Sequence, residues 1–397
     1  MAAARLKAAM DSVAFRFVLT MGVVNLFADI TYEGGGSING PFLGSLGASA
    51  ALISIVAGLG EFLGYSLRAV AGHAADRTGK YWPISFVGYA INLLAVPAMA
   101  LAGSWQLAAL LMLAERIGRA IRKPTIETML SYTTAKFGRG WVFAVNTALD
   151  ETGATLGPLL MAAVLFFRGS YSMAYAMLLT SSLLALGSLT IARIGFPVPA
   201  DLGEGASAPE RDFTSAFWLY MTGGALFAAG LMSYELISFH LVSVGLISKS
   251  WMPVTLAFAT GTGVIANLLL GRLFDRVGMR IVLAAVILSA LFTPLVFSGS
   301  LLFVLIAMPL WGVGYAVQDT LFKALVAGIL PDKKRGLAFG LFYAGYGFGW
   351  LIGSVAVGLL YQQSRPALVT FAVAAQLCSL PFFILGNRHQ RARLKYI

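Results

Sequence analysis

Two carboxylates interrupt an apolar run near the start of the chain. Asp29 and Glu33 lie four residues apart within Leu26–Gly36, and this spacing places both side chains on one face of a helix. An acidic side chain in an apolar membrane-like segment is energetically expensive, so it is a candidate functional group. The pair is predicted to be a protonation site that lines a central cavity. The structural alternative is that these acids pair with a buried base such as Arg68 and hold helices together.

Further ionisable residues lie inside apolar segments and extend this candidate set. Glu235 follows Ser233-Tyr234 as Glu33 follows Thr31-Tyr32, about 200 residues earlier. At the position that matches Asp29 the chain has Leu231, so Asp29 distinguishes the two copies. The remaining candidates for proton coupling or the substrate cavity are Glu61, Arg68, Arg116, Arg119, Asp150, Glu151 and His240.

The basic members of this set need counter-charges. Glu115 can pair with Arg119 at a spacing of four, which leaves Arg116 to balance an acid on another segment, Asp150 or Glu151. Arg122 and Lys123 are expected to extend to the aqueous interface, as long basic side chains do near the ends of membrane spans.

Arg68 lies seven residues after Glu61, two helical turns along the same face. It is either the counter-charge of an acid in the first span or an anion-binding group. His240, one turn beyond Glu235, can titrate near neutral pH, with a hydrogen-bonded wall position as the alternative.

Neither a metal site nor enzyme chemistry is predicted. No His, Cys and Asp cluster has the spacing of metal ligands. A nucleotide-binding loop of the Gly-x-x-x-x-Gly-Lys-Ser/Thr type is absent. The expectation is therefore a protein that is not an enzyme, has no cofactor, and uses the proton gradient as its driving force.

The elements that position these residues are membrane helices. Of 397 residues, 58% are hydrophobic and 11% are charged, whereas a soluble chain carries about 25% charged residues. Apolar runs of about 20 residues, the length of a membrane-crossing helix, recur along the whole chain. The composition predicts an all-α polytopic membrane protein in contact with the lipid bilayer.

The predicted spans number twelve, and a Pro- and Gly-rich linker divides them. An N-terminal six-helix bundle is expected over residues 1–192, a cytoplasmic linker over 193–213, and a C-terminal six-helix bundle with a basic cytoplasmic tail over 214–397. The spans are 13–46, 49–72, 81–103, 105–132, 139–167, 171–192, 214–247, 251–271, 281–299, 301–328, 337–361 and 366–386. In the first span, Gly34 to Gly36 are expected to permit a bend.

The loop charges give the orientation. The net charge of +11 does not indicate nucleic-acid binding, because the basic residues gather in alternate loops. One side has only Arg168, Lys249 and Arg365. The positive-inside rule therefore predicts a multi-pass protein of the plasma (inner) membrane with both termini cytoplasmic. The other side has Arg5, Lys7, Arg77, Lys80, Lys136, Arg139, Arg193, Arg211, Arg272, Arg276, Arg280, Lys333, Lys334, Arg335 and the tail from Arg388 to Lys395.

An internal repeat relates the two halves. Gly72–Lys80 matches Gly271–Arg280 at an offset of 199, while Gly153 and Gly157 match Gly349 and Gly353 at an offset of 196. Halves repeated in parallel, related by an axis along the membrane normal, are typical of one large class of transporters.

At these residues the chain resembles the major facilitator superfamily, whose loop signature is Gly-x-x-x-Asp-Arg-x-Gly-Arg/Lys. The resemblance implies two pseudo-symmetric six-helix bundles and transport by alternating access. It also implies that Asp76 and Asp275 cap facing helix ends, while Arg77 and Arg276 hold loop contacts, which is a gating role. The two copies of the signature supply Gly72, Asp76, Arg77 and Gly79, and Gly271, Asp275, Arg276 and Gly278.

The fifth span contains Gly153-Ala-Thr-Leu-Gly157-Pro158. It resembles the core of a motif found in proton-coupled antiporters of this superfamily. The resemblance implies a hinge at Gly153, Gly157 and Pro158, and it implies that the solute is exported. Close helix packing selects the same glycine spacing, so the packing alternative stays open.

The leading hypothesis is a secondary transporter that resembles the drug/proton antiporter branch. It would export a small amphipathic or drug-like solute, with that small molecule, protons and lipid as its partners, no nucleic acid, and a monomeric state. The first alternative is uptake or exchange of a small organic anion held by Arg68, Arg116 and Arg119. The second is a non-transporting membrane receptor on the same fold.

Overall fold

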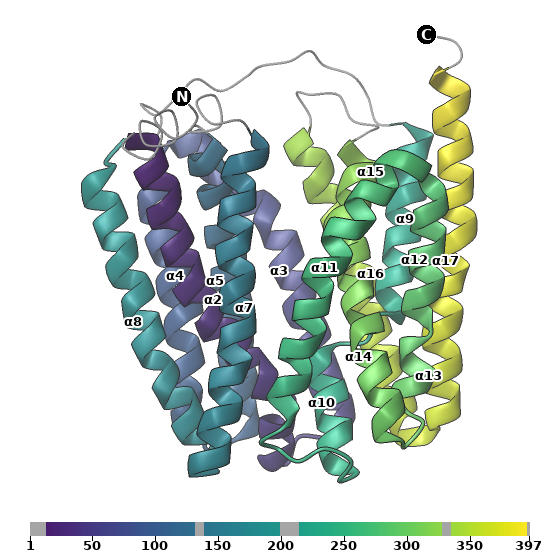
Figure 1. The fold of residues 1–397 in the computed structure, drawn as a ribbon, viewed down its shortest axis with the longest axis horizontal. Coiled ribbons are helices and arrows are strands. Elements are labelled where there is room, and N and C mark those ends of the chain that lie inside the picture. The colour runs from purple at the N-terminus through teal and green to yellow at the C-terminus, as the bar shows by residue number, and fades with distance from the viewer. Residues whose placement is uncertain (1–12, 132–138, 199–213, 328–334, 395–397) are drawn as a thin grey trace, which may run out of the picture.

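The computed structural model describes residues 13–131, 139–198, 214–327 and 335–394. Every regular element in these ranges is a helix, and long helices run side by side between the two ends of the molecule (Figure 1). The first turn of α2 and the last turns of α17 lie at the same end, the upper end in Figure 1. The all-α membrane architecture expected from composition is confirmed.

The first half of the chain forms six long helices. They are α2 (Val13–Ser45), α3 (Ala50–Thr78), α4 (Tyr81–Ala98) with its 3₁₀ extension η1 (Met99–Leu101), α5 (Trp105–Ser131), α7 (Arg139–Arg168) and α8 (Tyr171–Gly195).

The second half has shorter pieces between its long helices. They are α9 (Ser215–Gly230), α10 (Tyr234–Ser243), α11 (Met252–Val277), α12 (Met279–Ala290), α13 (Phe292–Val296), α14 (Leu301–Ala316), the π-helical turn η3 (Val317–Phe322), α15 (Lys323–Ala327), α16 (Arg335–Gln363) and α17 (Arg365–Leu394).

Within the described ranges, eleven stretches are long and apolar enough to cross a membrane. The twelfth predicted span is α5, which is also a long helix but carries a run of charged residues from Glu115 to Lys123. Several helices begin where a hydroxyl side chain caps them. Ser49, Ser170 and Thr214 each accept a hydrogen bond from the backbone amide three residues later, at 3.3–3.4 Å.

The seventh and first predicted spans differ in helix structure. The seventh, predicted as one segment over 214–247, is broken into α9 and α10, with extended backbone at Leu231 and Ser233. This break places Glu235 in the first turn of α10. In the first span, Gly34 to Gly36 lie inside the uninterrupted helix α2. A Cβ on Gly34 would meet the Gly157 carbonyl oxygen at 3.3 Å, so this glycine allows close packing of α2 on α7.

Equivalent glycines pack the repeated helices in both halves. A Cβ on Gly153 would collide with the backbone at Leu26, and one on Gly157 would collide with Ile30, so α7 lies tightly on α2. Gly349 and Gly353 bring α16 equally close to α9, where a Cβ would strike backbone atoms of Ala225 and Ala229. The fifth span therefore packs on the first as the eleventh packs on the seventh.

The two halves meet along α3 and α16, α7 and α11, and α2 and α10. Between α3 and α16, the Ser54 hydroxyl donates to the Ser354 carbonyl oxygen at 2.7 Å. Near the lower end, Lys249 Nζ donates to the Gly169 carbonyl oxygen at 2.7 Å, which joins a loop of each half. Gly40 of α2 lies directly against the backbone of Glu235 in α10.

In the first half, polar side chains lie between two buried apolar clusters. One buried cluster of this half contains Phe17 to Ala28 of α2, and the other begins on the same helix at Ile38. Asp29 and Glu33 lie between these two clusters.

Candidate functional site

The centre of the candidate site is the row of arginines on α5. Arg116, Arg119 and Arg122 recur every three residues, so they share one side of the helix. Gly88 and Gly118 let α4 and α5 approach closely, since a Cβ on Gly88 would meet the Gly118 carbonyl oxygen at 2.9 Å. The arginines therefore lie on a helix that is held firmly against its neighbour.

Arg116 pairs with three glutamates from three helices. Its Nη1 lies 2.8 Å from Glu61 Oε1 of α3, and its Nε lies 3.4 Å from Glu115 Oε2. Its Nη2 donates to Glu235 Oε1 of α10 at 3.1 Å. Because α10 belongs to the second half, this guanidinium group joins the two halves. A planar guanidinium with five donors suits such multiple pairing.

Arg119 links the same network to the first helix. Its Nη2 lies 3.1 Å from Glu115 Oε1, which confirms the expected pair at a spacing of four. Its Nη1 is 3.9 Å from Glu33 Oε1, and its guanidinium lies over the Tyr32 ring at 4.2 Å. The Glu33 side chain is 28% exposed, the highest value among the paired acids. Glu33 is therefore the most loosely held carboxylate of the network.

Arg122 is buried instead of reaching the aqueous interface, so the expectation for this residue was wrong. Its Nε donates to Asn92 Oδ1 at 3.1 Å, and its Nη2 is 3.9 Å from Asp29 Oδ1. The guanidinium also lies over the rings of Tyr89 and Tyr32, at 4.5 and 5.4 Å. These partners satisfy the group inside the protein.

Uncharged polar groups complete the surroundings of the buried acids. Asn92 Nδ2 donates to Glu115 Oε1 at 2.9 Å. The Tyr89 hydroxyl donates to Asn25 Oδ1 at 2.7 Å, and Asn25 Nδ2 donates to Asn146 Oδ1 at 3.0 Å. This series of hydrogen bonds connects α4, α2 and α7 close to Asp29.

The ion-paired network has more acids than bases. Among the described residues it has three guanidinium groups and five carboxylates, so its net charge is −2 when every group is ionised. Uncompensated charge is costly in a buried site, so the network is suited to take up cations, including protons. The carboxylates are Asp29, Glu33, Glu61, Glu115 and Glu235.

The structure brings together six of the residues predicted for the cavity: Asp29, Glu33, Glu61, Glu235, Arg116 and Arg119. The proposed partners were partly wrong. Arg116 pairs with the three glutamates rather than with Asp150 or Glu151 on α7. Asp150 is close enough to Asp29 and Lys123 to interact with them electrostatically.

Arg68 does not serve as the counter-charge of Asp29 or Glu33, because the arginines of α5 do. Its guanidinium lies over the Tyr65 ring at 4.9 Å, and its Nε is buried without a hydrogen-bond partner. His240 occupies a wall position. Its Nδ1 lies 2.9 Å from the Tyr361 hydroxyl, and its ring packs on Phe297 with centroids 4.4 Å apart.

The loop-signature residues lie at the upper end. Gly79 ends α3 with a φ of +64°, and Gly278 separates α11 from α12 with a φ of +61°, backbone values that glycine adopts without strain. Arg77, Asp275 and Arg276 are exposed, and Asp275 makes neither an ion pair nor a hydrogen bond with any described side chain. The gating role of Asp275 stays a prediction, and the side chain of Asp76 lies outside the described residues. Gly72 and Gly271 pack near Pro124 and Thr320.

Sequence reasoning missed Arg122, Tyr32, Tyr89, Asn25 and Asn92 as members of the site. One usable signal was present, the three-residue period of Arg116, Arg119 and Arg122. The asparagines and tyrosines are indistinguishable in sequence from packing residues. Asp319 lies four residues before Lys323, a spacing that favours a pair on one helix face. The side chain of Asp319 lies outside the described residues.

Comparisons with known proteins give a consistent family. Residues 213–395 match the family model described as Major Facilitator Superfamily. An uncharacterised protein of Mycobacterium tuberculosis is 35% identical over 92% of each chain. An uncharacterised transporter of the major facilitator type from Methanocaldococcus jannaschii is 24% identical over 87% of this chain and 89% of its own. A crystal structure of the peptide transporter POT in complex with sulfate superimposes with a TM-score of 0.77 at 14% identity, covering 95% of both chains.

Proposed function

The chain belongs to the major facilitator superfamily and is a multi-pass secondary transporter, and from that premise we propose that it couples proton movement to the export of a small amphipathic or drug-like solute. The observation that carries the proposal is the buried network in which Arg116 binds Glu61 and Glu115 of one half and Glu235 of the other. This network has two more carboxylates than guanidinium groups.

The charge imbalance supplies a physical basis for coupling. A proton on Glu235 removes its negative charge and weakens the contact with Arg116, which is one of the links between the halves. Loss of that link favours separation of α10 from α5. A proton or a cationic solute that enters the network thereby changes the relative energies of two arrangements, as alternating access requires.

Outward transport rests on weaker support than coupling does. Gly153 and Gly157 resemble an antiporter motif, but Gly349 and Gly353 make the same kind of close contact in the second half. Packing therefore explains both glycines of the motif. Pro158 has no counterpart, because Ser354 stands at the matching position. The hinge role thus depends on Pro158, within α7. The plasma-membrane location, the cytoplasmic termini and the monomeric state belong to this proposal and rest on the loop charges and the fold.

The organic-anion alternative is less well supported by the geometry. Arg116 and Arg119, two of its three proposed ligands, are already paired with carboxylates. An anion would have to displace those groups. Of the three proposed ligands, Arg68 alone has a buried donor that lacks a hydrogen-bond partner among the described residues.

Replacement of Glu33 by Gln is expected to abolish pH-driven transport while the protein still folds. Glu33 is the most accessible and most loosely paired acid, so its neutralisation leaves the contacts of Arg116 intact. In proteoliposomes with an imposed pH gradient, accumulation of the lipophilic cation ethidium would fall by at least about tenfold, the equivalent of about 1.4 kcal/mol. Glu127→Gln, which neutralises an exposed acid of α5, is the matched control.

A readout that needs no substrate accompanies this experiment. The distance between spin labels at Ser104 and Ser298, exposed positions near the lower end of each half, should depend on pH in the parent chain and less so in Glu33→Gln. Arg68→Ala tests the anion alternative in the same vesicles and should leave ethidium transport unchanged. Undiminished pH-driven transport by Glu33→Gln would reject the role of Glu33, and a label distance that is independent of pH in the parent chain would reject proton coupling.

A further inference from the structure

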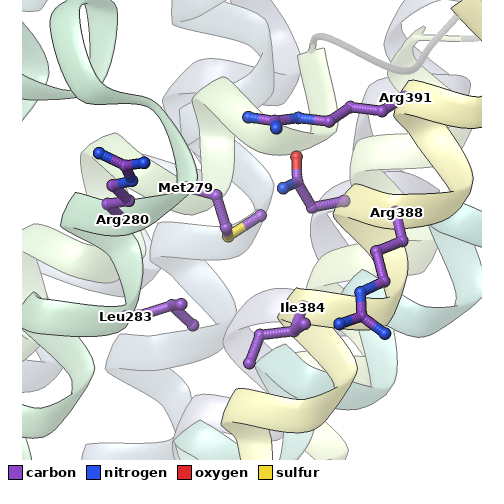
Figure 2. Close-up of a pocket in the computed structure, with 7 residues that line it drawn as sticks. Met279, Arg280, Leu283, Ile384, Arg388 and Arg391 are labelled. Atoms are coloured by element: carbon purple, nitrogen blue, oxygen red, sulfur yellow. The ribbon is translucent and has the colours of Figure 1, made fainter.

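A pocket outside the buried network opens at the upper end of the second half. It lies between the first turns of α12 and the last turns of α17 and has a volume of about 250 Å³ (Figure 2). α12 supplies Met279, Arg280 and Leu283, and α17 supplies Ile384, Asn387, Arg388 and Arg391.

The polar part of this pocket is strongly basic. Three arginines and one asparagine amide line it, and no acidic side chain does. Arg280, Arg388 and Arg391 are exposed, and within the described ranges none of them forms an ion pair. In Figure 2, Arg391 extends from α17 toward the α12 side of the pocket. Arginines that line one pocket from two helices, with no ion-pair partner among the described residues, are suited to bind a phosphate group, with several donors each.

The remaining part of the pocket is apolar. Leu283 and Ile384 lie on opposite sides of it, one on each helix, and Met279 lies closer to the arginines (Figure 2). A small soluble anion would leave this apolar surface uncovered. An amphipathic anion with a phosphate head and a hydrocarbon chain would cover both parts.

A pocket in the first half provides a comparison. It lies between α4 and α5 and is lined by Lys80, Ile84, Val87 and Ile121, with Thr78 and Pro83. Ile84 corresponds to Leu283 in the internal repeat, so both halves keep an apolar wall at this place. Lys80 is the only charged residue in that lining. The pocket between α12 and α17 is therefore the more basic of the two.

We propose that the pocket between α12 and α17 binds the phosphate headgroup of an anionic phospholipid. Arg280, Arg388 and Arg391 hold the phosphate, and an acyl chain lies along Leu283 and Ile384. The position fits a lipid, since the pocket lies at the ends of two membrane-spanning helices. Basic pockets between such helices recognise anionic headgroups through this combination of charge and depth. A bound lipid joins α12 to α17 within the second half.

Native mass spectrometry of the purified full-length protein, titrated with phosphatidylglycerol or phosphatidylcholine, tests the assignment. The parent protein should retain phosphatidylglycerol preferentially. Each arginine replaced by Gln should weaken that binding about fivefold, following the typical contribution of one basic residue near an anionic membrane surface. Arg280→Gln, Arg388→Gln and Arg391→Gln are made singly and together. Lys80→Gln is the matched control and should bind as the parent does.

Three results would overturn the proposal. Equal retention of phosphatidylcholine would remove the role of the charged headgroup. Displacement of phosphatidylglycerol by an equimolar amount of inorganic phosphate would identify a site for soluble anions. Unchanged binding by all three single variants, each confirmed to be folded by circular dichroism, would place the lipid elsewhere. Should the triple variant fail to fold, the single variants still decide the outcome, because each removes one exposed side chain.

Discussion

Replacement of Arg116 by Ala is expected to abolish transport and to lower the free energy of unfolding by about 3–5 kcal/mol, the usual cost of removing one partner from a buried ion pair. The cost arises because Glu61, Glu115 and Glu235 all lose a guanidinium group within 3.4 Å. Three carboxylates would then face one another with fewer positive charges nearby. Thermal unfolding followed by tryptophan fluorescence, with ethidium transport in proteoliposomes, measures both effects.

Matched variants separate the charge of Arg116 from its geometry. Arg116→Lys keeps the positive charge but cannot bridge three acids with a planar fork. Compared with Arg116→Ala, it should therefore restore the free energy of unfolding more fully than the transport rate. Arg116→Gln combined with Glu235→Gln removes the ion pair between the two halves. It leaves fewer unpaired acids than Arg116→Gln alone does. The double variant should be more stable than Arg116→Gln and still uncoupled. Transport by Arg116→Ala at the parent rate would contradict the central role given to this residue.

Replacement of Gly40 by Ala is expected to shift the conformational equilibrium away from the arrangement in which α2 and α10 are in contact. A Cβ at this position would collide with the Glu235 carbonyl oxygen and approach Ser238 Oγ to 2.6 Å. A backbone carbonyl cannot rotate away as a side chain does, so overpacking here costs about 1–3 kcal/mol. That cost changes the ratio of the two arrangements by about fivefold or more.

Spin-label distances between the lower ends of the two halves measure this shift. The labels are attached at Ser104 and Ser298 in a chain whose exposed Cys378 is replaced by Ser. Gly36→Ala is the control, because a Cβ one turn earlier on α2 meets no atom within 4 Å. Gly40→Ala should broaden the distribution or move it to longer distances, while Gly36→Ala should match the parent. Identical distributions for all three chains would show that the α2–α10 contact does not limit closure.

Local sequence patterns predicted the presence of the site better than its connections. Asp29 and Glu33 were identifiable because an acid in an apolar run is costly and conspicuous. Their actual partners depend on which helices lie side by side. The contact of α4 with α5 at Gly88 and Gly118 brings Asn92 to the acids and arginines, and nothing in the spacing of residues far apart in the chain reveals that neighbour.

The break in the seventh span shows a second limit of sequence patterns. Gly230 to Ser233 contains no proline, and its composition is compatible with a continuous helix. In the structure the Trp311 indole donates to the Met232 carbonyl oxygen at 2.9 Å, which satisfies one of the backbone groups that the break exposes. That partner is 79 residues away in sequence, so only the tertiary structure stabilises the interruption.

This interruption has a mechanical consequence. No continuous ladder of backbone hydrogen bonds runs from α9 into α10, and bending stiffness in a helix depends on that ladder. α9 is fixed to α16 through Gly349 and Gly353, whereas the ten residues of α10 carry both the glutamate that binds Arg116 and the surface that contacts Gly40. The orientation of α10 is therefore set by its own side-chain contacts, such as Tyr234 with Met252 and His240 with Tyr361, and not by a helical connection to α9. A change in those contacts alters the tilt of α10 without bending a continuous helix.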